Sequence, residues 1–355
     1  MKIALITDTH FGVKNDSPVM LDHMKEFLDE TFFPYIDRHN IKSVVHLGDL
    51  VDRRKYININ TAKRLREDFL DPIARMPLDF HIIAGNHDTY YKNTNNVNSL
   101  SELVKYQYQK FYVIDDVPYP KRFGDTNILL TPWICDENRE DSLRTINETY
   151  CPILFGHLEL AGFPMYVGAP PSDGDDPSIF NRFDTVCSGH YHHRSSRGNI
   201  HYLGSPCEFT WADYNDRKGF HIFDTETREL EFIQNPKTMF EKIWYDDATL
   251  GHEPEGIDLS YYAGKHIKVI IKNKLDPYRF DMFIAQLEKH GVHDLQVVED
   301  HLNLNLEEDA DIINEAEDTM SILRKYLTGM SANTDIKVRV EKIVTDLYTK
   351  AQTIE

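Results

Sequence analysis

The sequence predicts an α/β fold in which layered β-sheets form a sandwich flanked by helices, followed by a smaller second domain. Three observations predict it. Apolar strands alternate with amphipathic helices in the N-terminal part, shorter β-like runs follow with few helices between them, and the pattern changes near residue 240. With 355 residues, the chain is also longer than one compact core usually spans, so we expect two domains.

The N-terminal part alternates buried strands with helices. The apolar run from Lys2 to Thr7 stops at Asp8, which indicates a buried strand that ends in a polar loop. Ser17 and Pro18 form a cap and first-turn pair, so a helix should begin there. The elements expected next are a strand over 43–47, a helix over 61–75, a strand over 80–84, and a helix opened by Ser99 with Glu102 as its capping-box partner.

The remaining elements define the expected division of the chain. Four β-like runs cover 127–131, 153–155, 185–187 and 220–224. A strand over 267–271, a helix over 277–290 and a strand over 294–298 then form a βαβ unit. We therefore expect a principal domain over 1–240, a small βαβ domain over 245–317 and helices over 318–355.

The last of these helices carries an apolar stripe whose members fall at helical spacing. They are Ile336, Val340, Ile343, Val344 and Leu347. Such a stripe can pack on its own domain, which is the more common arrangement, or it can bind in the groove of a partner. The spacing alone leaves both alternatives open.

Composition excludes several classes of protein. A formal charge of −19 argues against a uniformly basic surface, so any contact with nucleic acid has to be local. The four cysteines are far apart with no C-x-x-C pair, which disfavours a zinc ribbon or a disulfide scaffold and indicates a reducing, cytoplasmic setting. The N-terminus lacks a signal-peptide core, and we expect no membrane span.

Polar motifs follow five of the predicted strands. They are Asp8-x-His10, Gly48-Asp49, Gly85-Asn86-His87-Asp88, Gly156-His157 and Gly189-His190-x-His192. Because loops at the ends of strands in an α/β sheet converge, these side chains should meet in space. Carboxylates, an amide and imidazoles without thiolates favour Mn, Fe, Mg or Zn in an open site. If the backbone is extended, the two side chains of each x-spaced pair face the same way.

Each motif has a structural alternative when it stands alone. A lone histidine such as His157 is more often a satisfied structural residue than a ligand. His46, His201 and His221 are interpreted in that structural way. Five motifs that each follow their own strand make a non-functional interpretation of the whole set improbable.

The motifs resemble those of the calcineurin-like metallophosphoesterases, and within them the SbcD-type nucleases. The segments that carry the resemblance are KIALITDTHFG, VVHLGDLVD, IIAGNHD and, from Tyr202 to Phe220, YLGSPCEFTWADYNDRKGF. SbcD-type nucleases are the bacterial relatives of the nuclease subunit of the Mre/Rad repair complex. The chain departs from the pattern at His193, which extends Gly-His-x-His, and over 158–183, which does not align.

The resemblance implies a centre of two divalent ions, Mn²⁺ or alternatively Mg²⁺. One ion would be held by Asp8, His10, Asp49 and His192, and the second by Asp49, Asn86, His157 and His190, so that Asp49 is shared. His87 is the candidate general acid, with Asp88 orienting its ring; capping of the loop is the alternative role for Asp88.

Basic and aromatic residues follow two of the metal-binding loops. They are Arg53, Arg54, Lys55, Tyr90, Tyr91 and Lys92. Such side chains can hold a phosphate or stack on an end base, although surface Arg and Lys are often only solvated. They are our candidate contacts to DNA.

The resemblance implies a manganese-dependent DNA nuclease with 3′ to 5′ exonuclease and single-strand endonuclease activity in recombination and double-strand-break repair. The βαβ domain would be a capping, DNA-binding domain. The C-terminal helices would bind an SMC-like coiled-coil ATPase, with the chain a homodimer within a heterotetramer. One rival is a metallophosphatase or small-nucleotide phosphodiesterase with the same centre, which needs no such C-terminal third. A non-catalytic scaffold is a second rival, opposed by the complete ligand set.

Overall fold

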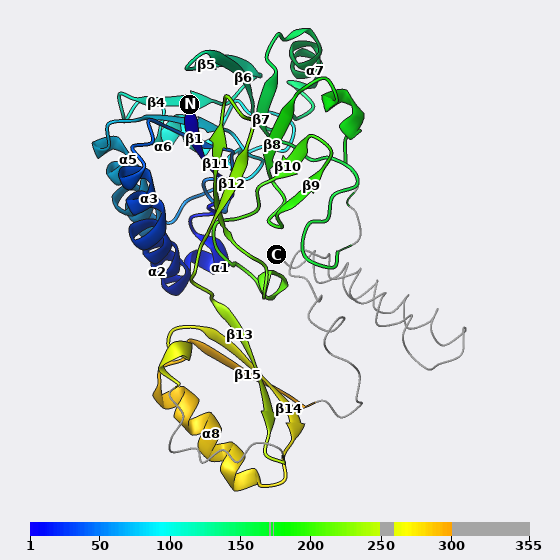
Figure 1. The fold of residues 1–355 in the computed structure, drawn as a ribbon. Helices are drawn as coiled ribbons and strands as arrows, with labels where there is room; N and C mark the ends of the chain where they lie inside the picture. Colours follow the sequence, from blue (N-terminus) through cyan, green and yellow to red (C-terminus); the bar gives the residue numbers. More distant parts are fainter. Residues whose placement is uncertain (170–171, 173, 249–258, 300–355) are drawn as a thin grey trace, which may run out of the picture. The chain divides into compact units, whose positions relative to one another are not determined.

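The computed structural model describes residues 1–169, 172, 174–248 and 259–299 (Figure 1). The chain divides into two compact units. The first comprises Met1–Phe209 and Asp213–Glu299, and the second comprises Thr210–Ala212 and Asp300–Glu355. The predicted helices over 318–355 lie outside the described residues, as does their apolar stripe of Ile336, Val340, Ile343, Val344 and Leu347.

The first sheet has six strands in the order β12-β11-β1-β2-β3-β4. Their bounds are Leu230–Gln234 for β12, Gly219–Asp224 for β11, Lys2–Ile6 for β1, Ser43–His46 for β2, Asp79–Ile83 for β3 and Phe111–Ile114 for β4. Strands β1 to β4 run parallel, whereas β11 is antiparallel to both of its neighbours. The carboxyl ends of β1, β2 and β3 therefore lie at one edge, where the first three polar motifs begin.

The second sheet also has six strands, in the order β5-β6-β7-β8-β10-β9. Their bounds are Tyr119–Phe123 for β5, Thr126–Thr131 for β6, Ile153–His157 for β7, Thr185–Gly189 for β8, Ile200–Tyr202 for β10 and Ser195–Arg197 for β9. Strands β6, β7, β8 and β10 are parallel, and the two edge strands are antiparallel to their neighbours.

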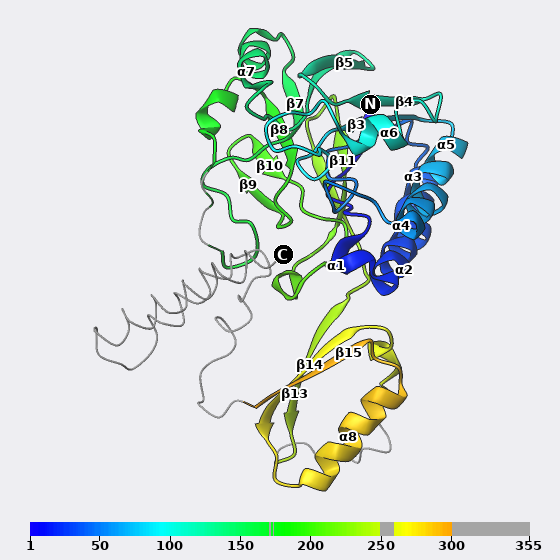
Figure 2. The same ribbon diagram turned by 180° about the vertical axis from the view of Figure 1, so that it is seen from behind.

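Buried apolar side chains from both sheets form the core between them. Ile3, Leu5 and Val45 of the first sheet share one cluster with Ile128 and Phe155 of the second, all fully buried. Each sheet also has helices on its outer side, as the two opposite views show (Figures 1 and 2). The predicted sheet sandwich flanked by helices is confirmed.

The helices outside the sheets include two long runs that each pass through a π-helical turn. The runs are α2 Pro18–Phe27, η1 Leu28–Phe32 and α3 Phe33–Arg38, and then α4 Ile59–Arg64, η2 Leu65–Leu70 and α5 Asp71–Arg75. The shorter elements are α1 Val13–Asp16, α6 Ser99–Leu103, α7 Arg139–Glu148, η3 Pro177–Phe180 and η4 Trp211–Asp213. The cap of α6 differs from the prediction: Asn98 accepts from Ser101 N at 2.8 Å, so Asn98 and not Ser99 is the N-cap.

The third sheet has three parallel strands, and one helix packs against it. They are β13 Phe240–Asp246, β14 His266–Asn273, α8 Pro277–Lys289 and β15 Asp294–Glu299, with the short η6 Ser260–Tyr262 before β14. The helix packs Phe280, Phe283 and Leu287 against Ile267 and Val269 of the sheet. The predicted βαβ unit is present, and β13 extends it to residues before the predicted start at 245.

No helix among the described residues combines the length and the apolar character that crossing a bilayer requires.

A buried carboxylate connects the segment after β10 to the start of β13. Glu208 Oε2 accepts hydrogen bonds from Met239 N at 2.6 Å and Phe240 N at 3.0 Å. Burial is the largest influence on this group and raises the pKa of Glu208 from its usual 4.5 to about 7. Because the carboxyl pKa is raised in the folded chain, the protonated form of Glu208 stabilises the fold. This stabilisation is complete below about pH 4.5 and is lost as the pH rises through 7.

We therefore expect Glu208→Gln to reduce the loss of stability between pH 5 and pH 8. The wild type should lose roughly 1 to 3 kcal/mol more than the variant over this range, because only its buried carboxyl has to ionise. The measurement is the melting temperature at both pH values in the presence of a chelator. Glu226→Gln, at a carboxylate with 83% of its side chain exposed, is the matched control. Equal pH dependence in all three chains would remove Glu208 as the cause.

Candidate metal centre

Five loops bring the predicted ligands together, and each loop begins where a strand ends. Asp8 follows β1, Asp49 follows β2, Asn86 follows β3, His157 is the last residue of β7 and His190 follows β8. The centre is therefore built at the carboxyl ends of strands from both sheets, as the spacing of the motifs predicts.

The ligand atoms form two groups. In the first, His10 Nε2 lies 3.0 Å from His192 Nε2 and 4.0 Å from Asp8 Oδ1. In the second, Asn86 Oδ1 lies 2.9 Å from both His157 Nε2 and His190 Nδ1. These are the same two groups that the resemblance implies.

Asp49 lies between the two groups. Its Oδ2 is 3.6 Å from His10 Nε2 and 3.5 Å from His157 Nε2, so one oxygen faces both sets of ligands. The carboxylate is 1% exposed. A single buried carboxylate at this position can serve two ions at once.

The donor set fits two divalent cations. Ligand atoms that each lie about 2.1 Å from a common ion are separated from one another by roughly 3 to 3.5 Å. The distances between His10, His192 and Asp49 and those around Asn86 fall near this range. Two imidazole nitrogens at 3.0 Å also need a shared cation or a proton between them, because two facing lone pairs would repel each other. The set of imidazole, carboxylate and amide ligands suits Mn²⁺, Fe²⁺ or Zn²⁺.

Four of the ligands have a left-handed backbone conformation that non-glycine residues rarely adopt. The φ angles are 52° at Asp8, 41° at His10, 56° at Asp49 and 90° at His190. The expectation of an extended backbone at the x-spaced pairs is therefore wrong at Asp8, His10 and His190. Strain of this kind persists where the surrounding structure holds it, and it is concentrated at functional sites.

Gly85 permits the close approach of two of these loops. A Cβ at this position would lie 2.2 Å from Asp49 Oδ1 and 2.3 Å from Asp49 N. Only glycine fits, because neither a backbone nitrogen nor a fixed carboxylate can move away.

The electrostatics of the centre demand positive charge. Burial alone would lower the pKa of His10 and of His157. The neighbouring carboxylates outweigh burial, so that the pKa of each rises from its usual 6.5 to about 9. Burial lowers the pKa of His190 and of His192 to about 3. The raised pKa of His10 and His157 reflects the pull of the buried carboxylates on positive charge, which a divalent cation can supply in place of a proton.

His87 is not one of the predicted ligands, but its ring lies beside the centre, with a ring nitrogen within 4.8 Å of ligand atoms of His10 and Asp52. Its backbone N donates to Asp49 Oδ1 at 2.7 Å, and its Nδ1 donates to the carbonyl oxygen of Asp52 at 2.6 Å. The ring is edge-on to His10, with centroids 4.8 Å apart. With Nδ1 engaged, Nε2 is the nitrogen that can transfer a proton.

Asp88 does not contact the ring of His87, so the predicted orienting role is wrong. Its Oδ2 accepts from Gly85 N at 2.9 Å and Asp49 N at 2.8 Å, and its Oδ1 accepts from Leu50 N at 2.9 Å. These bonds join the Asp49 loop to the Gly85 loop, which is the loop-capping alternative. The physical reason is that a buried carboxylate needs several donors, and backbone N–H groups supply them.

Sequence reasoning missed Asp52, which supports two histidines of the centre. Its carbonyl oxygen holds His87, and its Oδ1 lies 3.5 Å from His10 Nδ1. A carboxylate behind a ligating histidine orients the ring and raises its basicity. The sequence feature that could have revealed Asp52 is its position three residues after Asp49 in the same loop.

Lys218, in the segment from Tyr202 to Phe220 that carries the resemblance, is a second residue whose role was missed. Its Nζ donates to the carbonyl oxygen of His192 at 2.8 Å and pairs with Asp213 Oδ1 at 2.7 Å and Asp216 Oδ2 at 2.9 Å. The lysine side chain is 2% exposed. Asp213 also accepts from Phe209 N, and the Phe209 ring lies 5.7 Å from the rings of both His10 and His192. Lys218 is thus a positioning residue for the first group of ligands.

We expect Lys218→Met to weaken metal binding as well as folding. Loss of one partner of a buried ion pair should cost about 3 to 5 kcal/mol, and release of the His192 backbone should lower metal affinity roughly tenfold or more. Calorimetric titration of the folded variant with Mn²⁺ checks this. Lys237→Met, which breaks a more exposed pair with Glu30, is the matched control and should leave Mn²⁺ affinity unchanged. A folded Lys218→Met chain with wild-type Mn²⁺ affinity would reduce Lys218 to a purely structural residue.

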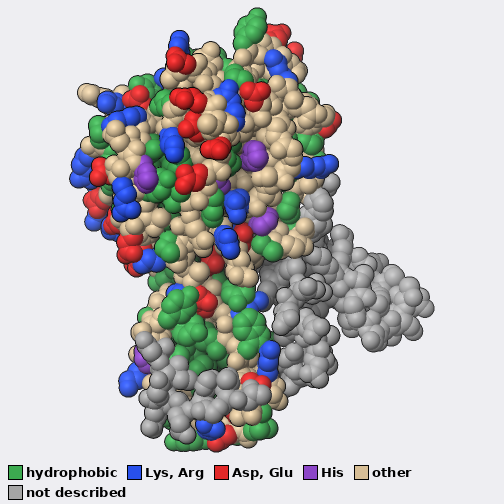
Figure 3. Space-filling view, in the orientation of Figure 1, with side chains coloured by type: hydrophobic (Ala, Val, Ile, Leu, Met, Phe, Trp, Pro, Cys, Tyr) green, Lys and Arg blue, Asp and Glu red, His purple; other side chains and the backbone are tan. Residues whose placement is uncertain are grey.

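The candidate DNA contacts differ in how far their side chains are exposed and bonded to other residues. Arg53 is engaged, with its guanidinium bonded to Asp16, Asn15 and Tyr56. Four members of the set, Lys55, Tyr90, Tyr91 and Lys92, are exposed. Arg54 is half-buried and lies over the Trp133 ring at 5.1 Å. Basic and acidic side chains are interspersed on the face shown in Figure 3, which agrees with local rather than continuous contact.

The chain is similar in sequence to one protein family and to two nuclease subunits. A model of the calcineurin-like phosphoesterase family matches residues 1–194. The chain is 32% identical over 340 residues to Exonuclease subunit 1 of Enterobacteria phage T4, which covers 94% of each chain. It is 26% identical over 260 residues to a subunit of the nuclease SbcCD of Staphylococcus epidermidis, which covers 65% of this chain and 67% of the relative.

Solved structures are more distant. An archaeal phosphodiesterase shares 15% identity at a TM-score of 0.35, covering 66% of this chain and 100% of that one. The two nuclease subunits confirm the resemblance to SbcD-type nucleases, and one of them is the exonuclease subunit of a T-even phage.

Proposed function

Because the chain belongs to the calcineurin-like phosphoesterase family, we propose that it is a metal-dependent nuclease that hydrolyses phosphodiester bonds in DNA. The observation that carries the proposal is the position of Asp49 Oδ2, 3.6 Å from one histidine group and 3.5 Å from the other. The similarity to a phage exonuclease subunit, which extends over 94% of the chain, favours DNA over other phosphate esters.

The chain's own residues account for the other requirements of phosphodiester cleavage. When bound, two divalent ions neutralise the phosphate oxygens and activate water for in-line attack. His87 gives a proton from Nε2 to the leaving oxygen, which departs as a hydroxyl group. The carbonyl of Asp52 holds the other ring nitrogen, and Asp88 joins the two loops so that His87 and Asp49 keep their separation.

We propose Mn²⁺ as the working metal, with Mg²⁺ as the alternative. Imidazole nitrogens contribute four of the seven predicted ligands, and imidazole favours transition metals over Mg²⁺. Mn²⁺ and Mg²⁺ are therefore compared in the same assay.

The deciding assay measures purified chain with Mn²⁺ or Mg²⁺ on end-labelled DNA, beside a generic phosphatase substrate such as p-nitrophenyl phosphate. Release of mononucleotides from a 3′ end and internal cuts in single strands support the proposed activities. Faster turnover of the phosphomonoester with intact DNA would instead support the metallophosphatase. Failure to act on either substrate, with metal bound, would support the scaffold.

We also propose that the C-terminal residues bind an SMC-like coiled-coil ATPase, as part of an assembly that contains two copies of each chain. The relatives are themselves named as subunits, which supports a partner. The contact residues proposed for it lie outside the described residues.

Deletion of residues 319–355 is expected to leave a folded, Mn²⁺-dependent nuclease on short DNA and to abolish co-purification with the ATPase. The stripe of apolar residues in this segment is the reason, because its loss removes the docking helix and not the metal centre. Co-expression and affinity purification measure binding, and the end-labelled assay measures activity. An unfolded product, or one that still binds the ATPase, would place this helix in the core of the chain.

A further inference from the structure

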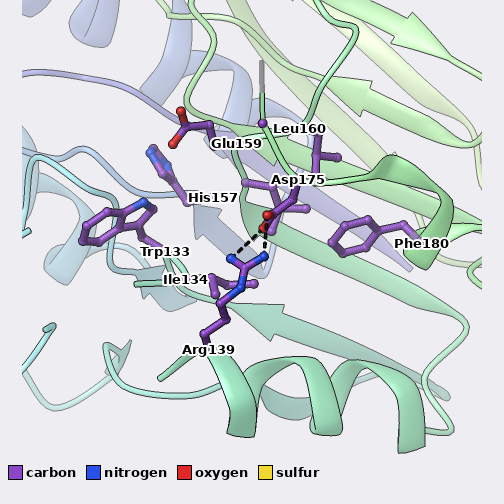
Figure 4. Close-up of a pocket in the computed structure, with 10 residues that line it drawn as sticks. Trp133, Ile134, Arg139, His157, Glu159, Leu160, Asp175 and Phe180 are labelled. Carbon is purple, nitrogen blue, oxygen red and sulfur yellow. Dashed lines mark hydrogen bonds and ion pairs between the residues drawn. The ribbon is translucent and has the colours of Figure 1, made fainter. Parts of the chain in front are cut away.

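A cavity of about 260 Å³ adjoins the metal centre (Figure 4). The predicted ligand His157 lines it together with Trp133, and Phe180 contributes an apolar wall. The volume is just below the ~300 Å³ at which pockets for small ligands begin. A cavity of this size holds at most one small ligand, such as a nucleoside, and excludes a duplex.

Trp133 is held rigidly beside the metal-binding loop. Its backbone N donates to the carbonyl of Ala84 at 2.7 Å, next to Gly85. Its own carbonyl accepts from Asn95 Nδ2 at 2.9 Å and from Asn138 Nδ2 at 3.1 Å. Arg54 lies over the indole and is not among the residues that line the cavity, so the ring meets the cavity on another side. The backbone that carries the indole is thus fixed, and the ring offers the cavity a flat surface for stacking.

The charges of the cavity select its occupant. Arg139 forms two bonds with the carboxylate of Asp175, Nη1 to Oδ2 at 3.1 Å and Nη2 to Oδ1 at 2.5 Å, so this cation is neutralised. Glu159 adds a further negative charge. A phosphate is therefore disfavoured inside the cavity, whereas an uncharged, planar heterocycle suits the tryptophan and the apolar wall.

We propose that this cavity binds the terminal nucleoside of the strand being cut, with its base stacked on Trp133. The inference rests on the proposed nuclease function and adds a subsite to it. Because His157 belongs both to the cavity and to the second ligand group, a base in the cavity places the attached phosphate toward the ions. Stacking is tolerant of sequence, since every base has a flat aromatic face.

The test compares two end-labelled oligonucleotides that differ only at the terminal nucleotide, one with a normal base and one with an abasic analogue. The wild type should lose roughly tenfold to a hundredfold in kcat/KM on the abasic end. Trp133→Ala should show the same loss on the normal end and no further loss on the abasic end. Trp133→Phe, which keeps a stacking ring, should restore most of the discrimination.

Binding gives a readout that does not depend on turnover. Fluorescence anisotropy in EDTA should show the same preference for the base-bearing end in the wild type and its absence in Trp133→Ala. Tyr150→Ala, at a tyrosine that is 98% exposed, is the control and should behave as the wild type. Equal activity and affinity for both ends in the wild type, or an equal loss on both ends in Trp133→Ala, overturns the subsite while leaving the nuclease intact. Absence of DNA cleavage on either end would instead contradict the proposed function itself.

Discussion

Replacing Asp49 by alanine is expected to lower nuclease activity at limiting Mn²⁺ on the order of a thousandfold or more, together with the metal content. The reason is geometric. One carboxylate oxygen faces His10 at 3.6 Å and His157 at 3.5 Å, so its loss removes a ligand from both predicted ions at once. The neighbouring carboxylate of Asp88 cannot replace it, because it is already bonded to backbone N–H groups.

Metal content by elemental analysis and activity on end-labelled DNA are measured on the same preparation. Asp125→Ala removes a fully exposed carboxylate from the β5–β6 turn and should change neither quantity. His190→Ala tests the second group alone and should lower the metal content by about one ion. Full activity of Asp49→Ala at limiting Mn²⁺ would contradict the two-metal assignment.

His87→Ala should keep both ions and lose about a hundredfold or more in kcat, because a general acid contributes on that scale. The structure places this histidine outside the two groups of predicted ligands and next to them, with Nδ1 engaged by the carbonyl of Asp52. Removing the ring leaves the backbone bond from residue 87 to Asp49 in place, so the bridging carboxylate should not move.

The measurement again pairs metal content with kcat, and the control is His39→Ala at an exposed histidine. A DNA substrate with a better leaving group should recover part of the lost rate in His87→Ala, since it needs less help from an acid. If metal and activity fall in proportion, His87 is a ligand or a structural support, and the proton has another source.

Much of the fold could be predicted because buried strands leave a local signal. β1, β2, β3, β7 and β8 are buried along nearly their whole length and contain short apolar runs, and their ends lie within a residue or two of the prediction. The missed strands, such as β5, β9 and β12, lie at sheet edges, and nearly all of their residues are exposed or only partly buried. Their pairing depends on neighbours far away in the chain, which a local pattern does not contain.

The limits of sequence reasoning are clearest at two aspartates and one lysine. Asp88 stands beside His87 in the chain, yet its carboxylate contacts the backbone of another loop, while Asp52 holds the His87 ring from that loop. Lys218 supports the His192 backbone from 26 residues away. Spacing shows which residues are near in sequence, and burial decides which of them need each other in space.

The sequence by itself determined the kinds of ligand and the fact that each follows a strand, because strand ends and donor chemistry are local properties. Only the tertiary structure decided that one oxygen of Asp49 faces both groups and that the carbonyl of Asp52 holds the His87 ring. The tertiary structure also decided that Trp133 closes a cavity against His157. The physical reason is that these distances arise where two packed sheets bring their loops together, and that packing is set by the whole core rather than by any one segment.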